Sequence, residues 1–133
     1  MIVYHGTTKE NAQSILKEGF SIEKQGENGS HFGKGIYLTT TKKRAKVYGK
    51  HVVSVEIDNT KLYLLTNWLK DYKNKCQEVY EAGTSADNVN TVVGEYIKNL
   101  YTSQGYTGIL MEGLIGKTKE IVIYDALTIK NIF

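Results

Sequence analysis

The sequence predicts a single α+β domain, and three observations indicate it. The chain has 133 residues, the size of one domain, and folding at this length buries about two-thirds of the surface that the unfolded chain exposes. Both ends carry short runs rich in β-branched and aromatic residues, which are typical of strands. The middle, residues 65–101, instead carries apolar residues at helical spacing. We therefore expect one domain spanning 1–133, with strands at both ends and helices between them.

The N-terminal part predicts a strand followed by a helix. The run "IVYH" at 2–5 reads as a short buried strand. Thr7 followed three residues later by Glu10 fits a capping box, so we expect a helix to begin there with Thr7 as the N-cap. Gly19 is a suitable C-terminal stop for that helix.

The next segments predict an irregular loop and then a compact strand, helix and strand. The loop covers 21–34, and "GIYL" at 35–38 reads as a strand. A short helix is expected over 41–49, followed by a strand over 51–57.

Two apolar stripes predict two long helices joined near Gly83. We expect their aromatic members to lie in the core, and Cys76, the single cysteine, to be an inert core thiol. The stripes consist of Leu65, Trp68, Leu69, Tyr72, Cys76, Val79 and Tyr80, and of Val89, Val92, Val93, Tyr96, Ile97, Leu100 and Tyr101.

The C-terminal part returns to strand. "TGILM" at 107–111 reads as a strand, and a turn is expected through "GLIGKT" at 113–118. The last segment, 120–133, predicts two strands around a bend at Asp125. "GLIGKT" is not a phosphate-binding loop, because the required glycine is replaced by Met111.

Composition excludes several classes of protein. The chain is 41% hydrophobic and 23% charged, as expected for a globular rather than a disordered protein. It shows no membrane span and no secretion signal, so we expect a cytoplasmic protein that does not engage a membrane. A net charge of +3 is too small to indicate nucleic-acid binding. Arg44 is the only arginine, which excludes a phosphate site built from several arginines.

Three segments suggest a function together: "YHGTT" at 4–8, "FGKGIY" at 32–37 with a second tyrosine at 48, and "EIVIYD" at 120–125. They resemble the ADP-ribosyltransferases of the diphtheria-toxin and poly(ADP-ribose) polymerase type, whose signature is a His, a Tyr and a Glu on three strands. The resemblance extends over essentially the whole chain. It implies the split, two-sheet antiparallel core of that family, flanked by helices, with NAD+ bound in the cleft between the sheets.

The resemblance also implies roles for individual residues. His5 would bond the adenine ribose, the backbone of Gly6 the nicotinamide carboxamide, and Thr7 the adenosine end. Tyr37 and Tyr48 would enclose the nicotinamide ring, a pyridinium cation that electron-rich aromatic faces attract.

Glu120 would be the catalytic carboxylate. By the resemblance, Glu120 holds the ribose 2′-hydroxyl and stabilises the positive charge that develops as the bond to nicotinamide breaks, with His5 and Tyr37 completing the catalytic set. We expect no metal, because nicotinamide leaves as a neutral molecule. The expected reaction is transfer of one ADP-ribose to a macromolecule, a protein rather than a nucleic acid.

Two alternatives stay open at this stage. An NAD-dependent tRNA 2′-phosphotransferase shares a similar "HGT" start but depends on arginines, of which this chain has one. An inactive module that binds NAD or ADP-ribose is the other alternative. Two departures from the family matter: Ala45 stands where the polymerase branch has a serine, and the helical segment 63–101 has no counterpart that we can align.

Overall fold

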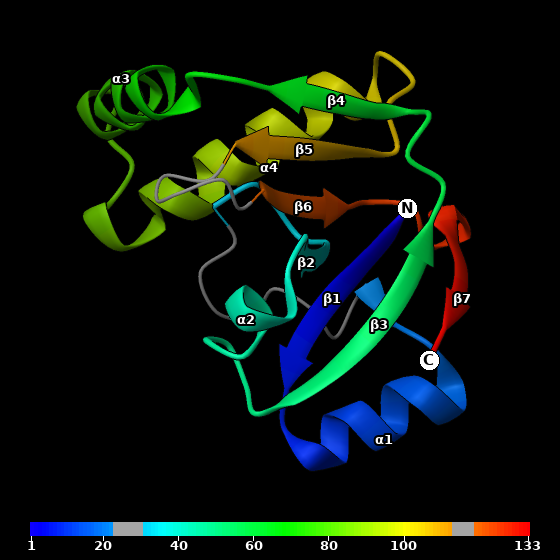
Figure 1. Cartoon of the computed structure of the whole chain (residues 1–133). Coiled ribbons are helices and arrows are strands. Elements are labelled where there is room, and N and C mark those ends of the chain that lie inside the picture. The colour runs from blue at the N-terminus through cyan, green and yellow to red at the C-terminus, as the bar shows by residue number, and fades with distance from the viewer. Residues whose placement is uncertain (23–30, 113–118) are drawn as a thin grey trace.

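The computed structural model describes residues 1–22, 31–112 and 119–133 and has mixed α and β structure, which confirms the α+β class (Figure 1). In these residues the strands form one seven-stranded sheet in the order β4-β5-β6-β2-β1-β3-β7. The strands are β1 (Ile2–Thr7), β2 (Ile36–Thr39), β3 (His51–Ile57), β4 (Leu62–Leu65), β5 (Gly108–Glu112), β6 (Lys119–Ile123) and β7 (Ile129–Ile132). The helices are α1 (Lys9–Glu18), α2 (Lys42–Ala45), α3 (Trp68–Glu81) and α4 (Val89–Thr102), with short 3-10 turns at Ala86–Asn88 and Ala126–Thr128.

The border between β1 and β2, in the middle of the sheet, is thinly paired. β1 pairs with β3 in antiparallel register from Ile2 to Thr7. Against β2, in contrast, its register rests on the single pair Tyr4 and Thr39. On its other side β2 pairs along its whole length with β6, from Ile36 to Thr39. The ladder between β1 and β2 is therefore reduced to one residue pair, in the middle of the seven-stranded sheet.

The two faces of the sheet carry two separate cores. One core gathers apolar residues of β1, β2, β3 and β6 against α1: Val3, Ala12, Ile15, Ile36, Leu38, Val53, Val55, Ile57, Ile121 and Ile123. The other lies under α3 and α4 and includes Phe32, Tyr72, Val89, Val93, Ile109, Met111, Val122 and Tyr124. Figure 1 shows α1 on one side of the β1–β3 half and α2 against β1 and β2. We call the face of the sheet that α1 covers the α1 face, and the face that α2 covers the α2 face.

The first helix begins one residue later than its capping box predicts. Thr8, not Thr7, is the N-cap of α1, and its Oγ1 accepts a hydrogen bond from Asn11 N at 3.2 Å. The assignment of the cap to Thr7 with Glu10 is therefore wrong, because Thr7 still belongs to β1 and pairs with His51. The stop at Gly19 is confirmed: its φ is 82°, and its N–H bonds to Ile15 O at 2.8 Å.

The prediction that Leu65 belongs to the first long helix is wrong, and the strand β4 is not predicted by the sequence. Leu65 ends β4, which pairs in parallel with β5, and α3 begins only at Trp68. Four residues of "LYLL" satisfy a helical stripe and a short strand equally well, so periodicity alone could not separate them. The predicted helix at 41–49 is likewise shorter, because α2 covers Lys42–Ala45 and continues as turns that end near Tyr48.

The remaining elements lie where the sequence predicts them. The two long helices are joined around Gly83, whose φ is 109°, and the bend at Asp125 separates β6 from β7. Cys76 is half-buried beside the second core, and burial raises the pKa of its thiol, in keeping with an inert group. The predicted turn at 113–118 and most of the loop at 21–34 lie outside the described residues. Across the described part of the chain, no helix is long and apolar enough to cross a membrane.

Candidate functional site

Glu120 lies near the start of β6 and its carboxylate is held by an arginine. Glu120 pairs with Thr39 of β2 on one side and with Met111 of β5 on the other. Directly paired residues of neighbouring strands point to the same face, so all three side chains lie on the α2 face. Arg44 Nε donates to Glu120 Oε1 at 2.9 Å, and the two side chains are 40% and 25% exposed. The carboxylate is thus partly accessible and held by Arg44 through Oε1.

Tyr48 belongs to the same group of side chains. Arg44 Nη2 donates to Tyr48 Oη at 3.3 Å, and the Arg44 guanidinium lies over the Tyr48 ring with its Cζ 5.4 Å from the centroid. Burial and the negative charge of Glu120 raise the pKa of Tyr48. The hydrogen bond to Glu120 raises the pKa of Arg44 above its usual range, so the guanidinium stays charged. Arg44 therefore links two residues that the sequence predicts for the site.

Sequence reasoning missed Arg44. It used this residue only to exclude a phosphate site built from several arginines, although two signals were present. Arg44 is the only arginine of the chain. It also precedes Tyr48 by four positions, a spacing that brings two side chains together on a helix.

Tyr37 lies in the middle of β2 with its side chain on the same face as Glu120. Tyr37 precedes Thr39 by two residues, and alternate residues of a strand share a face. Its hydroxyl donates to Gly33 O and accepts from Phe32 N. Burial raises the pKa of Tyr37 to about 12. These bonds fix the position of the ring and keep the hydroxyl protonated and engaged within the protein.

His5 lies on the other face, at the thinly paired border. Its neighbour Tyr4 pairs with Thr39, so His5 itself projects toward the α1 face, where its ring meets Phe20 edge to face at 5.2 Å between centroids. His5 Nδ1 lies 2.9 Å from the carbonyl oxygen of Tyr37. A carbonyl only accepts, so Nδ1 carries the proton, and burial lowers the pKa of His5 and keeps the ring neutral. Nε2 is therefore left with a lone pair that can accept a hydrogen bond.

Gly6 positions α2 rather than standing open to solvent. It is buried, and a Cβ added to it would lie 1.7 Å from the carbonyl oxygen of Ala45, the residue after Arg44. Gly49 packs in the same way, since a Cβ there would lie 2.4 Å from the oxygen of Thr7. The two glycines allow the segment that carries Arg44 and Tyr48 to seat directly on β1.

The predicted residues thus form two groups. Glu120, Tyr48 and Tyr37 share the α2 face, and Arg44 joins the first two. His5 contacts Tyr37 only through the Tyr37 backbone. An extended ligand reaching both groups would have to cross the border between β1 and β2. The α2-face group offers a partly exposed carboxylate and two aromatic rings, which suits a cationic or oxocarbenium-like centre.

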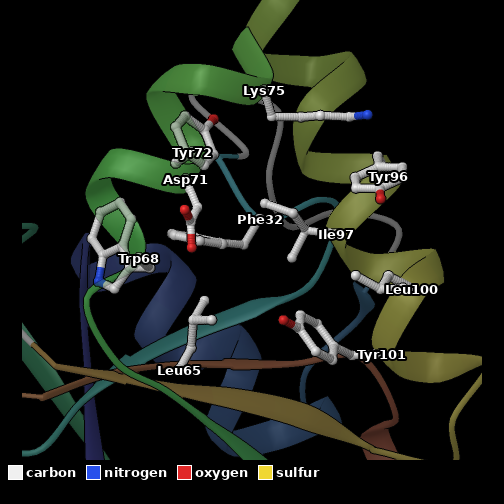
Figure 2. Close-up of a pocket in the computed structure, with 10 residues that line it drawn as sticks. All are labelled: Phe32, Leu65, Trp68, Asp71, Tyr72, Lys75, Tyr96, Ile97, Leu100 and Tyr101. Atoms are coloured by element: carbon white, nitrogen blue, oxygen red, sulfur yellow. The ribbon is translucent and has the colours of Figure 1, made fainter. Parts of the chain in front are cut away.

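A pocket of about 190 Å³ lies between α3 and α4 (Figure 2), and its wall includes neither His5 nor Tyr48. Pockets that bury a drug-sized ligand measure roughly 300–1,000 Å³, so this pocket is too small for a dinucleotide. Leu65, in its wall, is paired with Met111, which is paired with Glu120. Two strand spacings place Leu65 about 10 Å from Glu120 on the same face of the sheet. The wall of the pocket consists of Phe32, Leu65, Trp68, Asp71, Tyr72, Lys75, Tyr96, Ile97, Leu100 and Tyr101.

Within the ranges that the structure describes, no group of three or more His, Cys, Asp or Glu side chains is arranged to hold a metal ion.

Comparison with known proteins gives a family match and distant structural likenesses. A family model described as "Poly(ADP-ribose) polymerase catalytic domain" matches residues 1–94, a range that contains His5, Tyr37 and Tyr48 but ends before Glu120. No curated protein matches the chain. Among solved structures, one titled "Crystal structure of an anti-CRISPR protein" aligns with a TM-score of 0.48 and 15% identity, covering 95% of this chain and 90% of that chain.

Proposed function

The chain belongs to the poly(ADP-ribose) polymerase catalytic domain family, and on that premise we propose that it cleaves NAD+ and transfers one ADP-ribose to a macromolecular acceptor, releasing nicotinamide. Proteins of this family use NAD+ as their substrate. The residues proposed for the reaction are Glu120, His5, Tyr37 and Tyr48.

The border between β1 and β2 is the proposed NAD+ site, and it would correspond to the split between the two sheets of the ADP-ribosyltransferase fold. Register there is reduced to one pair, and His5 reaches across it to the Tyr37 backbone. The free Nε2 of His5 would accept from a hydroxyl of the adenine ribose. The rings of Tyr37 and Tyr48 would flank the pyridinium on the α2 face, with Gly6 and Thr7 bordering the site on β1.

Glu120 carries the proposed chemistry. The bond between C1′ of the ribose and the pyridinium nitrogen breaks, and its electron pair neutralises the departing nicotinamide. The oxocarbenium-like ribosyl centre is then captured by a nucleophile of the acceptor, which loses its proton. The Glu120 carboxylate, whose side chain is 25% exposed, would accept from the ribose 2′-hydroxyl and stabilise the positive charge at the transition state. No step requires a Lewis acid, so no metal is proposed.

The observation that carries this proposal is the meeting of Glu120 with Tyr48 through Arg44. Arg44 and Glu120 are 76 positions apart in the sequence and meet only through the fold. A carboxylate beside an aromatic ring is what the cleavage of a pyridinium riboside needs.

A protein is the proposed acceptor. The net charge of +3 is low for a nucleic-acid enzyme, which would carry a strongly basic face. The segment that includes α3 and α4 presents apolar side chains to solvent, among them Tyr96 at 46% and Leu100 at 38% exposure. Exposed apolar surface of this kind is characteristic of contact with another protein, so we propose that this segment contributes to acceptor recognition.

The test is incubation of the protein with NAD+ labelled in the adenylate part, in extract from a candidate host. We expect label in protease-sensitive, nuclease-resistant material, together with free nicotinamide in stoichiometric amount. Glu120→Gln is the matched control and should give neither. Label in nuclease-sensitive material would make the acceptor a nucleic acid. Dephosphorylation of a tRNA splice junction, or binding without nicotinamide release, would replace the proposed function by one of the two alternatives.

A further inference from the structure

Arg44 holds two acceptors at once with one guanidinium group. Its Nε donates to Glu120 Oε1 at 2.9 Å and its Nη2 donates to Tyr48 Oη at 3.3 Å. The guanidinium is planar and rigid, so these two donors fix the carboxylate and the phenol side by side. A lysine ammonium on a flexible stem could not fix both positions.

The Arg44 backbone is itself fixed by its surroundings. Its N–H donates to Thr41 Oγ1, the N-cap of α2, at 3.2 Å. Thr39 Oγ1 donates to Thr41 O at 2.9 Å, which ties the cap to the last residue of β2. Ala45 is fully buried and seated beneath Gly6. The guanidinium therefore starts from a defined point of the fold.

The arrangement leaves both groups partly accessible. Arg44 engages Glu120 through Oε1, and the Glu120 side chain stays 25% exposed. Arg44 also covers one face of the Tyr48 ring, with its Cζ at 5.4 Å from the centroid, and 58% of Tyr48 stays exposed. The contacts thus orient both groups without closing the site.

We propose that Arg44 is a positioning residue: it holds the carboxylate of Glu120 and the ring of Tyr48 in the relative arrangement that NAD+ cleavage requires. This inference rests on the proposed function for its catalytic part. Its structural part, the pairing of Arg44 with Glu120, stands on the described contacts alone.

A direct readout follows from Arg44 being the only arginine of the chain. In a ¹⁵N-labelled sample, arginine Nε–H groups resonate apart from backbone amides, so Arg44 contributes a single, assignable signal. We expect a downfield-shifted, slowly exchanging proton in the wild type. Glu120→Ala supplies the position of the unbonded group. If the wild-type signal coincides with that of Glu120→Ala, the pairing is absent and the inference is overturned.

Kinetics test the catalytic part, with Arg44→Gln, Arg44→Lys and the control Lys46→Gln. Lys46 is exposed and close by on the same segment, and its replacement removes the same charge without touching Glu120. Loss of orientation by about 1 Å can cost roughly 100-fold in rate, so we expect Arg44→Gln to lower kcat by roughly 10- to 100-fold with the KM for NAD+ within about threefold. The kcat of Arg44→Lys should lie between those of Arg44→Gln and the wild type, and the kcat of Lys46→Gln should equal that of the wild type.

Each other outcome is decisive. Unchanged or increased kcat in Arg44→Gln would overturn the positioning role and make Arg44 a brake on Glu120. Equal losses of kcat in Arg44→Gln and Lys46→Gln would show that the loss of one positive charge causes the effect, and would also overturn the positioning role. If the wild type releases no nicotinamide, the proposed function fails and the catalytic role of Arg44 fails with it, whereas the Nε–H signal still decides the pairing independently.

Discussion

Replacing Gly6 by alanine tests whether the packing of α2 on β1 sets up the site. The added Cβ would lie 1.7 Å from the Ala45 carbonyl oxygen and 2.6 Å from its carbon. Because both atoms belong to the backbone, no side-chain rotation can relieve the clash. A carbon and a carbonyl oxygen need about 3.3 Å, so α2 must retreat from β1 by about 1.6 Å. That movement carries Arg44, the residue before Ala45, away from Glu120.

The expected losses differ between stability and turnover. Overpacking of this kind typically costs about 1 to 3 kcal/mol. With an unfolding entropy of about 2.1 cal/mol/K per residue, a chain of this length should melt about 4 to 11 °C lower. Turnover should fall by roughly 100-fold, since a shift larger than 1 Å separates Arg44 from its partners. The Nε–H signal of Arg44 should move to its unbonded position.

Gly19→Ala is the matched control. Gly19 has φ 82° and ψ −179°, a region adopted essentially by glycine alone, and no atom lies within 4 Å of the added Cβ. Its cost is therefore backbone strain, again about 1 to 3 kcal/mol, on the far side of the sheet from α2. We expect comparable melting temperatures but normal NAD+ turnover for Gly19→Ala. Equal activity in the two variants, measured by nicotinamide release, would refute the reasoning.

Four further predictions follow from the site. Glu120→Gln should lower turnover by about 100- to 1,000-fold while leaving the KM for NAD+ unchanged, because the charge acts at the transition state; full nicotinamide release by this variant would show that the carboxylate is misassigned. Tyr48→Ala should weaken NAD+ binding by about 1 to 2 kcal/mol and Tyr48→Phe should bind almost normally in calorimetric titration, whereas normal binding by the alanine variant would remove the ring from the site. Burial lowers the pKa of His5 below 6.5, so below pH 6.5 the unfolded state binds the proton first and stability should fall as the pH drops; His5→Gln should flatten this part of the pH profile of the melting temperature, and an unchanged slope would contradict a buried neutral His5. NAD+ binding should be the same in excess chelator, and its loss there would reveal a metal requirement.

Much of the fold follows from local patterns. The helical stripes, the stop at Gly19 and the bend at Asp125 depend on residues close together in the sequence, and the structure confirms them. β4 was missed because its four residues gain their strand identity from pairing with β5, more than 40 residues later in the chain, which a local pattern does not contain.

The candidate site divides in the same way. The resemblance of short motifs selected Tyr37, Tyr48 and Glu120, and the structure places all three on one face of the sheet or beside it. The role of Arg44 depends on a contact with Glu120 at 76 positions' distance, and no motif encodes that contact. The opposite orientation of His5 follows from strand register, which becomes known only when Tyr4 is paired with Thr39.

The place of β6 beside β2 has a consequence for how the molecule assembles. β1 and β3 pair across about 50 residues, whereas β2 must wait for β6, about 80 residues further along the chain. Pairings of such long range form late, because a large loop must close before any contact is gained. A chain synthesised only as far as α4 carries Arg44 and Tyr48 but lacks Glu120, the carboxylate that Arg44 holds. On the proposed function, reactivity toward NAD+ would therefore depend on one late event, the docking of β6 beside β2.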